Sequence, residues 1–386
     1  MQFGFSPGRG TTDAMFVLRQ VQEKVLERGR RLYFAFLDLE KAYDRVPREV
    51  VYWCLRRRGV PERLINMVRA TYCDVTTSVR TQSGTTGKFD IKVGLHQGSA
   101  LSPFLFITIM DTLTEAGRTE VPWELIFADD IALVAETEEE LQAKVLEWQE
   151  SLKRGGLKMN PDKSEVLVTE RDGNQELRIL DTSGHTLKQV DRFKYLGTEI
   201  TREGGSRKAV EQRVKAAWNK WREMTGVLCD KKIPRKLKCK IYTTVVRPVL
   251  LYGAECWAMC KADEDLLSRT EMRMLRWIIG VSRLDRIPND EIRERCGVRD
   301  IRDKAREARL RWYGHVMRRD RDEAVKKVWD MQFQGRRPVG RPRKRWWDCI
   351  REDLTATGLH AEDAQDRARW RRGIRAADPG RVWENS

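Results

Sequence analysis

Leu125-Ile126-Phe127-Ala128-Asp129-Asp130-Ile131-Ala132-Leu133-Val134 places two adjacent carboxylates between two apolar runs. Each run predicts a short buried β-strand, with the two aspartates at the bend between them. Neighbouring anions beside a core repel each other and lose hydration, which is costly without a cation. The pair therefore predicts a site for a hard divalent metal such as Mg²⁺, which prefers oxygen ligands. The alternative is a solvated hairpin turn, because Asp is a common turn residue.

A second apolar run, residues 32–37, ends at Asp38. It does not alternate polar and apolar residues, so it predicts a strand that is covered on both faces. Apolar residues at helical spacing from Ala14 to Val25 predict a helix before it, with Gly29 as its stop. Asp38 alone could be a structural cap. Together with Asp129 and Asp130 it predicts a three-carboxylate cluster, as two-metal phosphoryl transfer requires.

Further motifs occur in a fixed order around these acids. The chain opens with Gln-Phe-Gly-Phe-Ser-Pro-Gly-Arg-Gly-Thr-Thr-Asp and later reads Phe-Leu-Asp-Leu-Glu-Lys-Ala-Tyr-Asp and Phe-Ala-Asp-Asp. In this order the sequence resembles the reverse transcriptases of non-LTR (LINE-like) retrotransposons over about its first 200 residues. The six matching segments are residues 2–13, 36–44, 94–103, 127–130, 156–164 and 195–197.

The resemblance implies an α+β fold: a right-hand polymerase palm, which is a small antiparallel sheet backed by helices, with partial fingers and a helical thumb. It implies an RNA-directed DNA polymerase that extends a DNA primer or target on an RNA template from dNTPs. Two Mg²⁺ ions, with Mn²⁺ as a substitute, would bind Asp38, Asp129 and Asp130, with Asp38 and Asp129 as the more direct ligands.

The resemblance also implies substrate contacts. Tyr43 would lie under the sugar of the incoming nucleotide, and Lys163 near the leaving pyrophosphate. Gln97 and Gly98 would line the nucleotide and template pocket, and a glycine lets a ligand approach the backbone closely. Packing alone could explain Tyr43, and Lys163 could be an ordinary surface lysine.

Local patterns predict the elements around this site. Ser102-Pro103 predicts the start of a helix, because proline is tolerated in the first turn. Thr137 and Glu140 form a capping-box pattern for another helix, which Gly155-Gly156 would end. Residues 166–168 and 193–196 predict short strands.

The chain has 386 residues and a net charge of +16. Residues 1–205 contribute about −2 and residues 206–386 about +18, and ten of the thirteen tryptophans follow residue 205. A basic, aromatic-rich half is typical of phosphate neutralisation and base stacking. The predicted domains are 1–205, partial fingers and palm; 206–290, a helical thumb; and 291–386, a basic, nucleic-acid-binding region.

Two basic segments supply candidate nucleic-acid contacts. The Gly-Arg-Pro core within residues 335–345 resembles an AT-hook, although Val339 replaces an arginine of that motif. A basic linker or a nuclear-import signal fits the same residues. The candidates are Lys231, Lys232, Arg235, Lys236, Arg336, Arg337, Arg341, Arg343, Lys344 and Arg345.

The remaining composition bounds the setting of the protein. No signal peptide or apolar span is evident, and the eight cysteines form no Cys-x-x-Cys pair. These features predict an intracellular, nuclear protein with no membrane or zinc site. In the family that the sequence resembles, a further fingers motif and often an endonuclease precede the segment matched by residues 2–13. Because the sequence begins at this segment, we expect a 5′-truncated element. A catalytically inactive, retrotransposon-derived nucleic-acid-binding protein is the alternative function, and a role in RNA folding is a third. Oligomeric state is not indicated.

Overall fold

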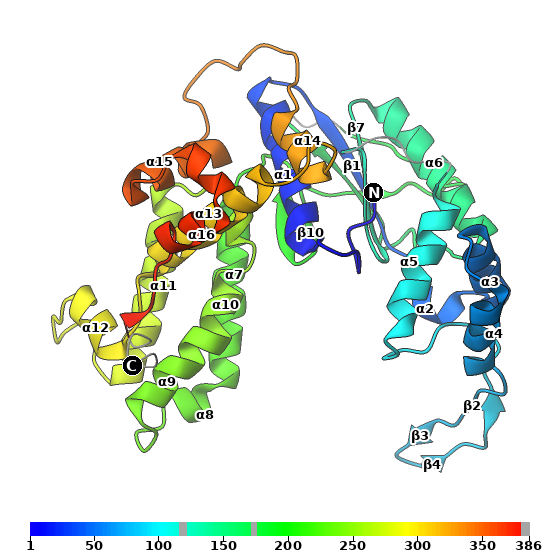
Figure 1. Cartoon of the computed structure of the whole chain (residues 1–386), viewed down its shortest axis with the longest axis horizontal. Helices are drawn as coiled ribbons and strands as arrows, with labels where there is room; N and C mark the ends of the chain where they lie inside the picture. The colour runs from blue at the N-terminus through cyan, green and yellow to red at the C-terminus, as the bar shows by residue number, and fades with distance from the viewer. Residues whose placement is uncertain (116–121, 171–175, 380–386) are drawn as a thin grey trace. The chain divides into compact units, whose positions relative to one another are not determined.

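The computed structural model describes residues 1–115, 122–170 and 176–379 (Figure 1). These residues form two compact units. Unit 1 contains residues 1–14 and 30–196, and unit 2 contains residues 15–29 and the chain from residue 197 onward. Helix α1 (Thr11–Glu27) begins in unit 1 and continues in unit 2. The division made from the sequence had assigned residues 15–29 to the first domain, and it stays a prediction.

Unit 1 mixes helices and strands, which confirms the α+β class. Its helices are α2 (Ala42–Arg45), α3 (Arg48–Arg57), α4 (Glu62–Thr71), α5 (Leu101–Leu113) and α6 (Glu138–Arg154). Its strands are β1 (Leu32–Leu37), β2 (Thr76–Thr77), β3 (Arg80–Thr81), β4 (Gly84–Thr85), β5 (Phe89–Asp90), β6 (Glu124–Phe127), β7 (Asp130–Ala135), β8 (Glu165–Thr169), β9 (Lys188–Gln189) and β10 (Arg192–Tyr195).

A five-stranded sheet in the order β6-β7-β1-β8-β9 forms the centre of unit 1. All its pairs are antiparallel except β8 with β9, so the antiparallel expectation holds for four strands and fails for the fifth. Leu37 of β1 pairs with Ile131 of β7. The same register continued by one residue sets Asp38 opposite Asp130, so the sheet itself brings the two strands' acids to one edge.

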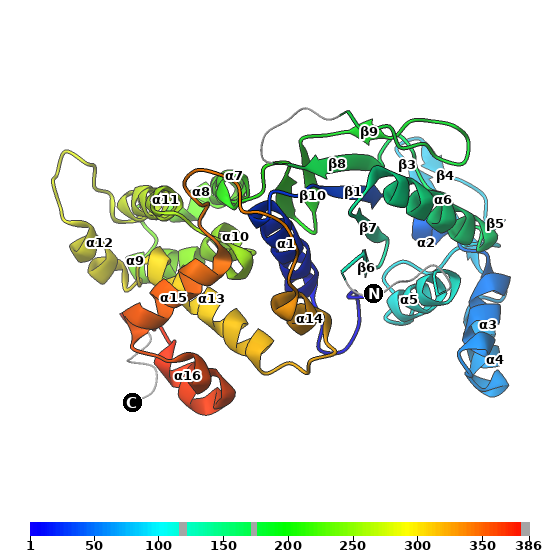
Figure 2. The ribbon, with the colours of Figure 1, turned by 90° about the horizontal axis from the view of Figure 1, so that it is seen from above.

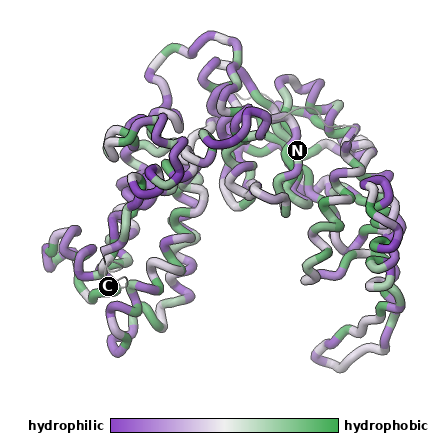
Figure 3. Tube along the Cα trace, in the orientation of Figure 1, coloured by the Kyte–Doolittle hydropathy of each residue, from purple (hydrophilic) through white to green (hydrophobic). Residues whose placement is uncertain are grey.

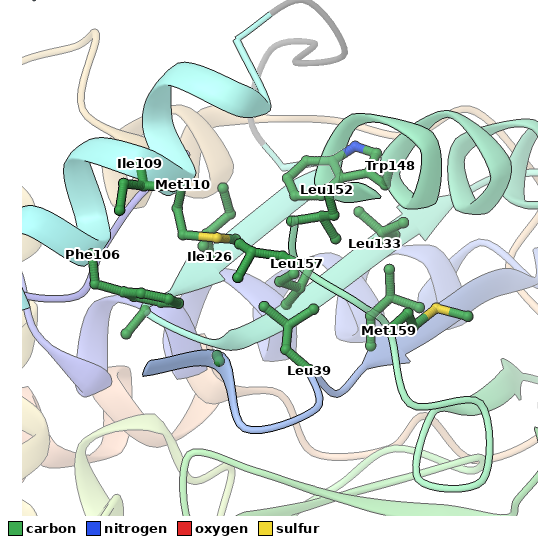
Figure 4. Close-up of a cluster of buried hydrophobic side chains, with 14 of the residues drawn as sticks. Leu39, Phe106, Ile109, Met110, Ile126, Leu133, Trp148, Leu152, Leu157 and Met159 are labelled. Carbon is green, nitrogen blue, oxygen red and sulfur yellow. The ribbon is translucent and has the colours of Figure 1, made fainter. Parts of the chain in front are cut away.

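Alternate residues of β1 face a shared core with helices α5 and α6. Tyr33, Ala35 and Leu37 belong to a buried cluster that also includes Phe106 and Trp148. Figure 4 shows the part of this cluster in which α5 and α6 lie against the sheet, and Figure 2 shows α6 beside the strands. All six residues of β1 are buried, so both faces of this strand are covered, as its unbroken apolar run predicted.

Local sequence signals explain the helix ends. The Thr137 hydroxyl accepts a hydrogen bond from the Glu140 backbone N–H (3.2 Å), and α6 ends at Gly155 as predicted. The Glu140 carboxylate accepts from the Glu136 N–H (3.1 Å), one residue before the position a capping box would use. Helix α5 begins at Leu101, beside the predicted Ser102-Pro103 start.

Unit 2 is almost entirely helical in the residues described. Its elements are β11 (Thr198–Thr201), α7 (Arg207–Glu223), α8 (Thr225–Leu228), α9 (Arg235–Ile241), the π-helical turn η1 (Tyr242–Val246), α10 (Arg247–Leu250), the 3₁₀ turn η2 (Ala254–Cys256), α11 (Lys261–Ile279), α12 (Asn289–Cys296), α13 (Ile301–Met317), α14 (Ala324–Asp330), α15 (Trp346–Thr357), the 3₁₀ turn η3 (Ala361–Gln365) and α16 (Arg367–Gly373).

All of the excess positive charge belongs to unit 2. Unit 2 differs from the predicted C-terminal half, residues 206–386, by two added segments. Residues 15–29 carry +1 and residues 197–205 carry −1, so unit 2 has the same net charge of +18. The loop between α14 and α15 is mostly hydrophilic (Figure 3) and contains neither helix nor strand. None of the helices described is both long and apolar enough to span a bilayer.

Candidate active site

The two aspartates lie in a tight turn between β6 and β7. Phe127 pairs with Asp130, so Ala128 and Asp129 form a two-residue hairpin loop. Ala128 has a φ of 57°, the positive value that matches such a loop to the twist of its strands. A side chain in this conformation costs on the order of 1–2 kcal/mol. The surrounding structure must therefore hold the turn that presents Asp129 and Asp130.

Gln2 supplies that support. Its side-chain oxygen accepts hydrogen bonds from the backbone N–H groups of Gly4 (2.9 Å) and Ala128 (3.2 Å). The Phe3 N–H also donates to the Ile126 carbonyl (2.8 Å), which fixes this segment along β6. A Cβ on Gly4 would lie 2.8 Å from the Ala128 nitrogen, too close for any other residue. Gln2 is therefore a positioning residue for the hairpin, a role that the sequence did not reveal.

We expect Gln2→Leu to loosen this turn, because two buried N–H groups would lose their acceptor while the side-chain size stays similar. The measurement is amide hydrogen exchange of residues 125–135, which should accelerate. Gln142→Leu is the matched control, since the Gln142 amide also makes two hydrogen bonds to the backbone, donating to the Leu180 carbonyl and accepting from the Leu180 N–H (2.7 Å for both bonds). Unchanged exchange in Gln2→Leu would contradict the assigned role.

Asp38 follows β1 and is held by the segment 157–164. The Asp38 N–H donates to the Ser164 hydroxyl (3.1 Å), and the Asn160 N–H donates to the Asp38 carbonyl (2.8 Å). The same segment brings the Lys163 ammonium to 4.0 Å from the Asp38 carboxylate. Lys163 is thus an exposed lysine whose ammonium group lies close to the predicted carboxylate cluster. Exposure at the surface is therefore compatible with the predicted contact to the pyrophosphate.

The three carboxylates influence one another electrostatically. Burial raises the pKa of Asp38, the Lys163 ammonium opposes this shift, and the Asp129 charge adds to it. Burial and the charges of Asp129 and Asp38 raise the pKa of Asp130 to about 6. The Asp130 residue is nevertheless exposed, so nearby protein atoms reduce the hydration of its carboxylate while leaving it accessible to solvent. The structure therefore brings Asp38, Asp129 and Asp130 together.

This donor set suits a hard divalent cation. Carboxylate oxygens are its preferred ligands, and a cation would relieve the repulsion that, in addition to burial, raises the pKa values of Asp38 and Asp130. In the described parts of the chain, no three His, Cys, Asp or Glu side chains are already arranged to hold a metal ion. Asp129 and Asp130 are exposed, so their side chains can turn toward a cation without displacing core atoms.

The predicted nucleotide-contacting residues lie on two segments that pack together. The Leu95 N–H donates to the Tyr43 carbonyl (2.7 Å), and the Gln97 amide donates to the Asp44 carboxylate (2.8 Å). The Tyr43 ring stacks on Phe106 with 4.5 Å between centroids. Burial raises the pKa of Tyr43, and the Asp129 charge raises it further, so the phenol lies within electrostatic reach of the cluster.

Gly98 has a φ of 84°, and a Cβ there would meet no atom within 4 Å. The positive φ is one reason for a glycine, and the open space agrees with a place where a ligand could approach. Gly94, on the same segment, also has positive φ, and a Cβ there would lie 2.7 Å from the Asp44 carbonyl oxygen. Gly94 thereby allows the close packing that positions Gln97.

The predicted basic contacts divide into three groups. Lys231, Lys232, Arg235 and Lys236 are exposed, and no carboxylate within the described residues forms an ion pair with them. By contrast, Lys344 pairs with Glu352 (2.6 Å), and Arg345 pairs with Glu27 and Asp348 (2.9 and 3.0 Å). Lys344 and Arg345 therefore have acidic partners within the protein, which the sequence of the basic run does not reveal.

The other four predicted contacts lie in the loop before α15. Arg336, Arg337, Arg341 and Arg343 are all exposed. The Arg343 guanidinium donates to the Glu203 carbonyl. Their contact with nucleic acid stays a prediction.

Comparison with known proteins identifies the family of this chain. Residues 1–200, slightly more than half of the chain, match the family described as reverse transcriptase (RNA-dependent DNA polymerase). The chain belongs to this family. The matched range includes the hairpin, Asp38 and the segment of Lys163.

Individual relatives agree with the family. The chain is 30% identical over 219 residues to the Pol polyprotein of the type-2 retrotransposable element R2DM from Drosophila melanogaster, covering 53% of this chain and 21% of that protein. It is 24% identical to the RNA-directed DNA polymerase from the mobile element jockey of the same species, covering 72% of this chain and 32% of that protein. These relatives confirm the resemblance to non-LTR, LINE-like reverse transcriptases.

The share of each matched protein that this chain spans differs widely. A transposon-derived protein of Caenorhabditis elegans is 29% identical over 268 residues, which covers 65% of this chain and 94% of that protein. The chain spans only about a fifth to a third of the two polymerase relatives. The solved structure of telomerase from Candida tropicalis superposes with a TM-score of 0.40 at 13% identity, over 96% of this chain and 57% of that one. A superposition at this level does not by itself define a fold.

Proposed function

We propose that this chain is an RNA-directed DNA polymerase of a non-LTR retrotransposon. It extends a DNA primer on an RNA template, using dNTPs, by attack of the primer 3′-hydroxyl on the α-phosphate. The observation that carries the proposal is the convergence of Asp38, Asp129 and Asp130 at one edge of the sheet in a reverse transcriptase family member. The finer division into palm, fingers and thumb, and the nuclear location, belong to this proposal.

Asp38 and Asp129 would be the main ligands of two Mg²⁺ ions, with Asp130 beside them. When bound, the metal supplies activation of the attacking hydroxyl and stabilisation of the leaving oxygen. The protein positions these groups before any substrate arrives. Gln2 holds the hairpin, and Ser164 and Asn160 hold the end of β1.

Lys163 and Tyr43 would act on the substrate side of the same cluster. The Lys163 ammonium lies 4.0 Å from the Asp38 carboxylate, so it would be close enough to pair with a phosphate oxygen of a substrate bound at the cluster. Stacking on Phe106 fixes the plane of the Tyr43 ring, so the ring can form a flat floor under a sugar. Gln97, fixed by Asp44, would line the template side.

Primer extension tests the proposal directly. The full chain, oligo(dT) annealed to poly(rA), dTTP and Mg²⁺ should give incorporation that chelation of the metal abolishes. Circular dichroism and template binding, measured on the same preparation, would show that the protein is folded. A folded, template-binding chain that incorporates no dTTP would overturn the proposal and favour the alternative of a catalytically inactive nucleic-acid-binding protein.

A further inference from the structure

Unit 2 has an aromatic hollow that the polymerase chemistry does not use. It has a volume of about 500 Å³ and lies against residues of α7, α8 and α11. We call it the tryptophan hollow. Its walls include Trp218, Trp221, Trp277, Arg222 and Arg273. Its size is within the range of sites that accept a small flat molecule or one unit of a polymer.

Two of the three tryptophans of the hollow, Trp218 and Trp277, keep part of their surface exposed, whereas an ordinary core would bury them. Trp277 is 62% exposed, and Trp218 is half-buried. The Trp218 and Trp221 rings meet edge to face, with centroids 6.1 Å apart and planes at 70°. Trp221 is buried and fixes this pair, so Trp218 and Trp277 are left as the aromatic surfaces that a ligand could cover.

The same walls carry positive charge that no acid neutralises. The Arg273 guanidinium lies over the Trp218 ring, 5.2 Å from its centroid. In the part of the chain that the structure describes, no carboxylate forms an ion pair with Arg273 or Arg222. Arg222 bonds instead to the neutral Trp218 carbonyl and Asn219 side chain. Lys231, Lys232 and Arg235, which follow α8 in the sequence, are exposed as well, and no carboxylate of the described residues pairs with them.

An occupant must therefore combine a flat apolar face with a negative charge. We propose that the tryptophan hollow binds an unpaired nucleobase of a single-stranded nucleic acid, with the neighbouring phosphate on Arg222 and Arg273. Stacking on tryptophan is sequence-tolerant, since every base has a π-face, and arginine adds phosphate contact. A duplex keeps its bases stacked inside and cannot offer one without unpairing. The inference stands apart from the polymerase proposal.

Binding of labelled twelve-residue oligonucleotides to the full chain, without dNTPs or metal, tests the site. Wild-type protein should bind oligo(dT) or oligo(rU) more tightly than an abasic strand of equal length, and the two base-bearing strands show which sugar is preferred. Trp277→Ala should weaken base-bearing strands by roughly ten-fold and leave the abasic strand unaffected. Arg273→Gln should weaken all strands and reduce the salt dependence by about one phosphate contact.

Trp53→Ala is the matched control, because Trp53 is also exposed (47%) beside an arginine, Arg57, but belongs to unit 1. A strand carrying 5-iodouracil should form a photochemical cross-link to Trp218 or Trp277. Equal affinity of wild-type protein for base-bearing and abasic strands, or cross-links only outside the tryptophan hollow, would overturn the inference. Asp129→Asn should leave this binding intact, so failure of polymerisation and failure of this site are separate results.

Discussion

Asp129→Asn is expected to reduce primer extension by roughly a thousand-fold or more while leaving binding of the RNA template nearly unchanged. The substitution removes one negative charge from the carboxylate cluster with almost no change in shape. Several kcal/mol of transition-state stabilisation through the metal would be lost, and each 1.4 kcal/mol is a factor of ten in rate. The measurement is single-turnover incorporation of dTMP, with template affinity measured in parallel.

Asp74→Asn is the control for this variant. Asp74 is an exposed aspartate in unit 1, and its positive φ of 52° is one that asparagine also adopts readily. It should keep wild-type activity. Synthesis at a normal rate by Asp129→Asn would show that the metal ligands have been assigned wrongly, whereas equal losses of synthesis and of template binding would indicate a folding defect.

The second large effect concerns the stability of unit 2. Arg309 and Asp353 form a buried, two-pronged ion pair with bonds of 2.8 and 2.9 Å. Their side chains are 3% and 7% exposed. Asp353→Ala would leave the guanidinium buried without its partner, which should lower the free energy of unfolding by about 3–5 kcal/mol. Urea unfolding followed by tryptophan fluorescence measures this change, because most tryptophans belong to unit 2.

Two further variants separate a lost charge pair from a general loss of packing. Arg309→Met combined with Asp353→Leu should cost less than Asp353→Ala, because no charge is left buried alone. Glu291→Ala breaks the exposed pair with Arg295 and should change stability by less than about 1 kcal/mol. A negligible effect of Asp353→Ala would mean that this pair does not hold α13 against α15.

The sequence was sufficient to predict the part of the site that depends on local pattern. Unbroken apolar runs identified β1, β6 and β7 as buried strands, and the candidate carboxylates follow the first run and lie between the other two. The antiparallel register then brings Asp38 and Asp130 together, which follows once the two strands are neighbours. Helix α6 was equally accessible, because Thr137 and Gly155 mark its ends.

Features that depend on distant partners could not be predicted. Gln2 supports Ala128 through a backbone N–H that lies 126 residues away, and a backbone donor leaves no mark in the sequence. Lys344 and Arg345 belong to the most basic run of the chain, yet their partners Glu352 and Glu27 make them part of the packing. A run of positive charge shows composition, but not which charges are neutralised.

The exposed hairpins between α4 and α5 were missed for another reason. The β2–β5 and β3–β4 pairs have strands of two residues each, and six of their eight residues expose polar side chains or glycine. Such short strands show no alternation of polar and apolar residues, so periodicity cannot detect them. Figure 1 shows them extending beyond the helices α3 and α4 of unit 1.

The most direct test of the central claim is incorporation of dTMP on poly(rA)–oligo(dT) as a function of Mg²⁺ concentration. It would compare the wild-type chain with a variant in which both Asp38 and Asp129 are replaced by asparagine. The wild-type chain should show Mg²⁺-dependent synthesis, and the double variant should bind the same primer–template without extending it. Mg²⁺-dependent synthesis by the double variant would contradict the assignment of these carboxylates as the catalytic centre.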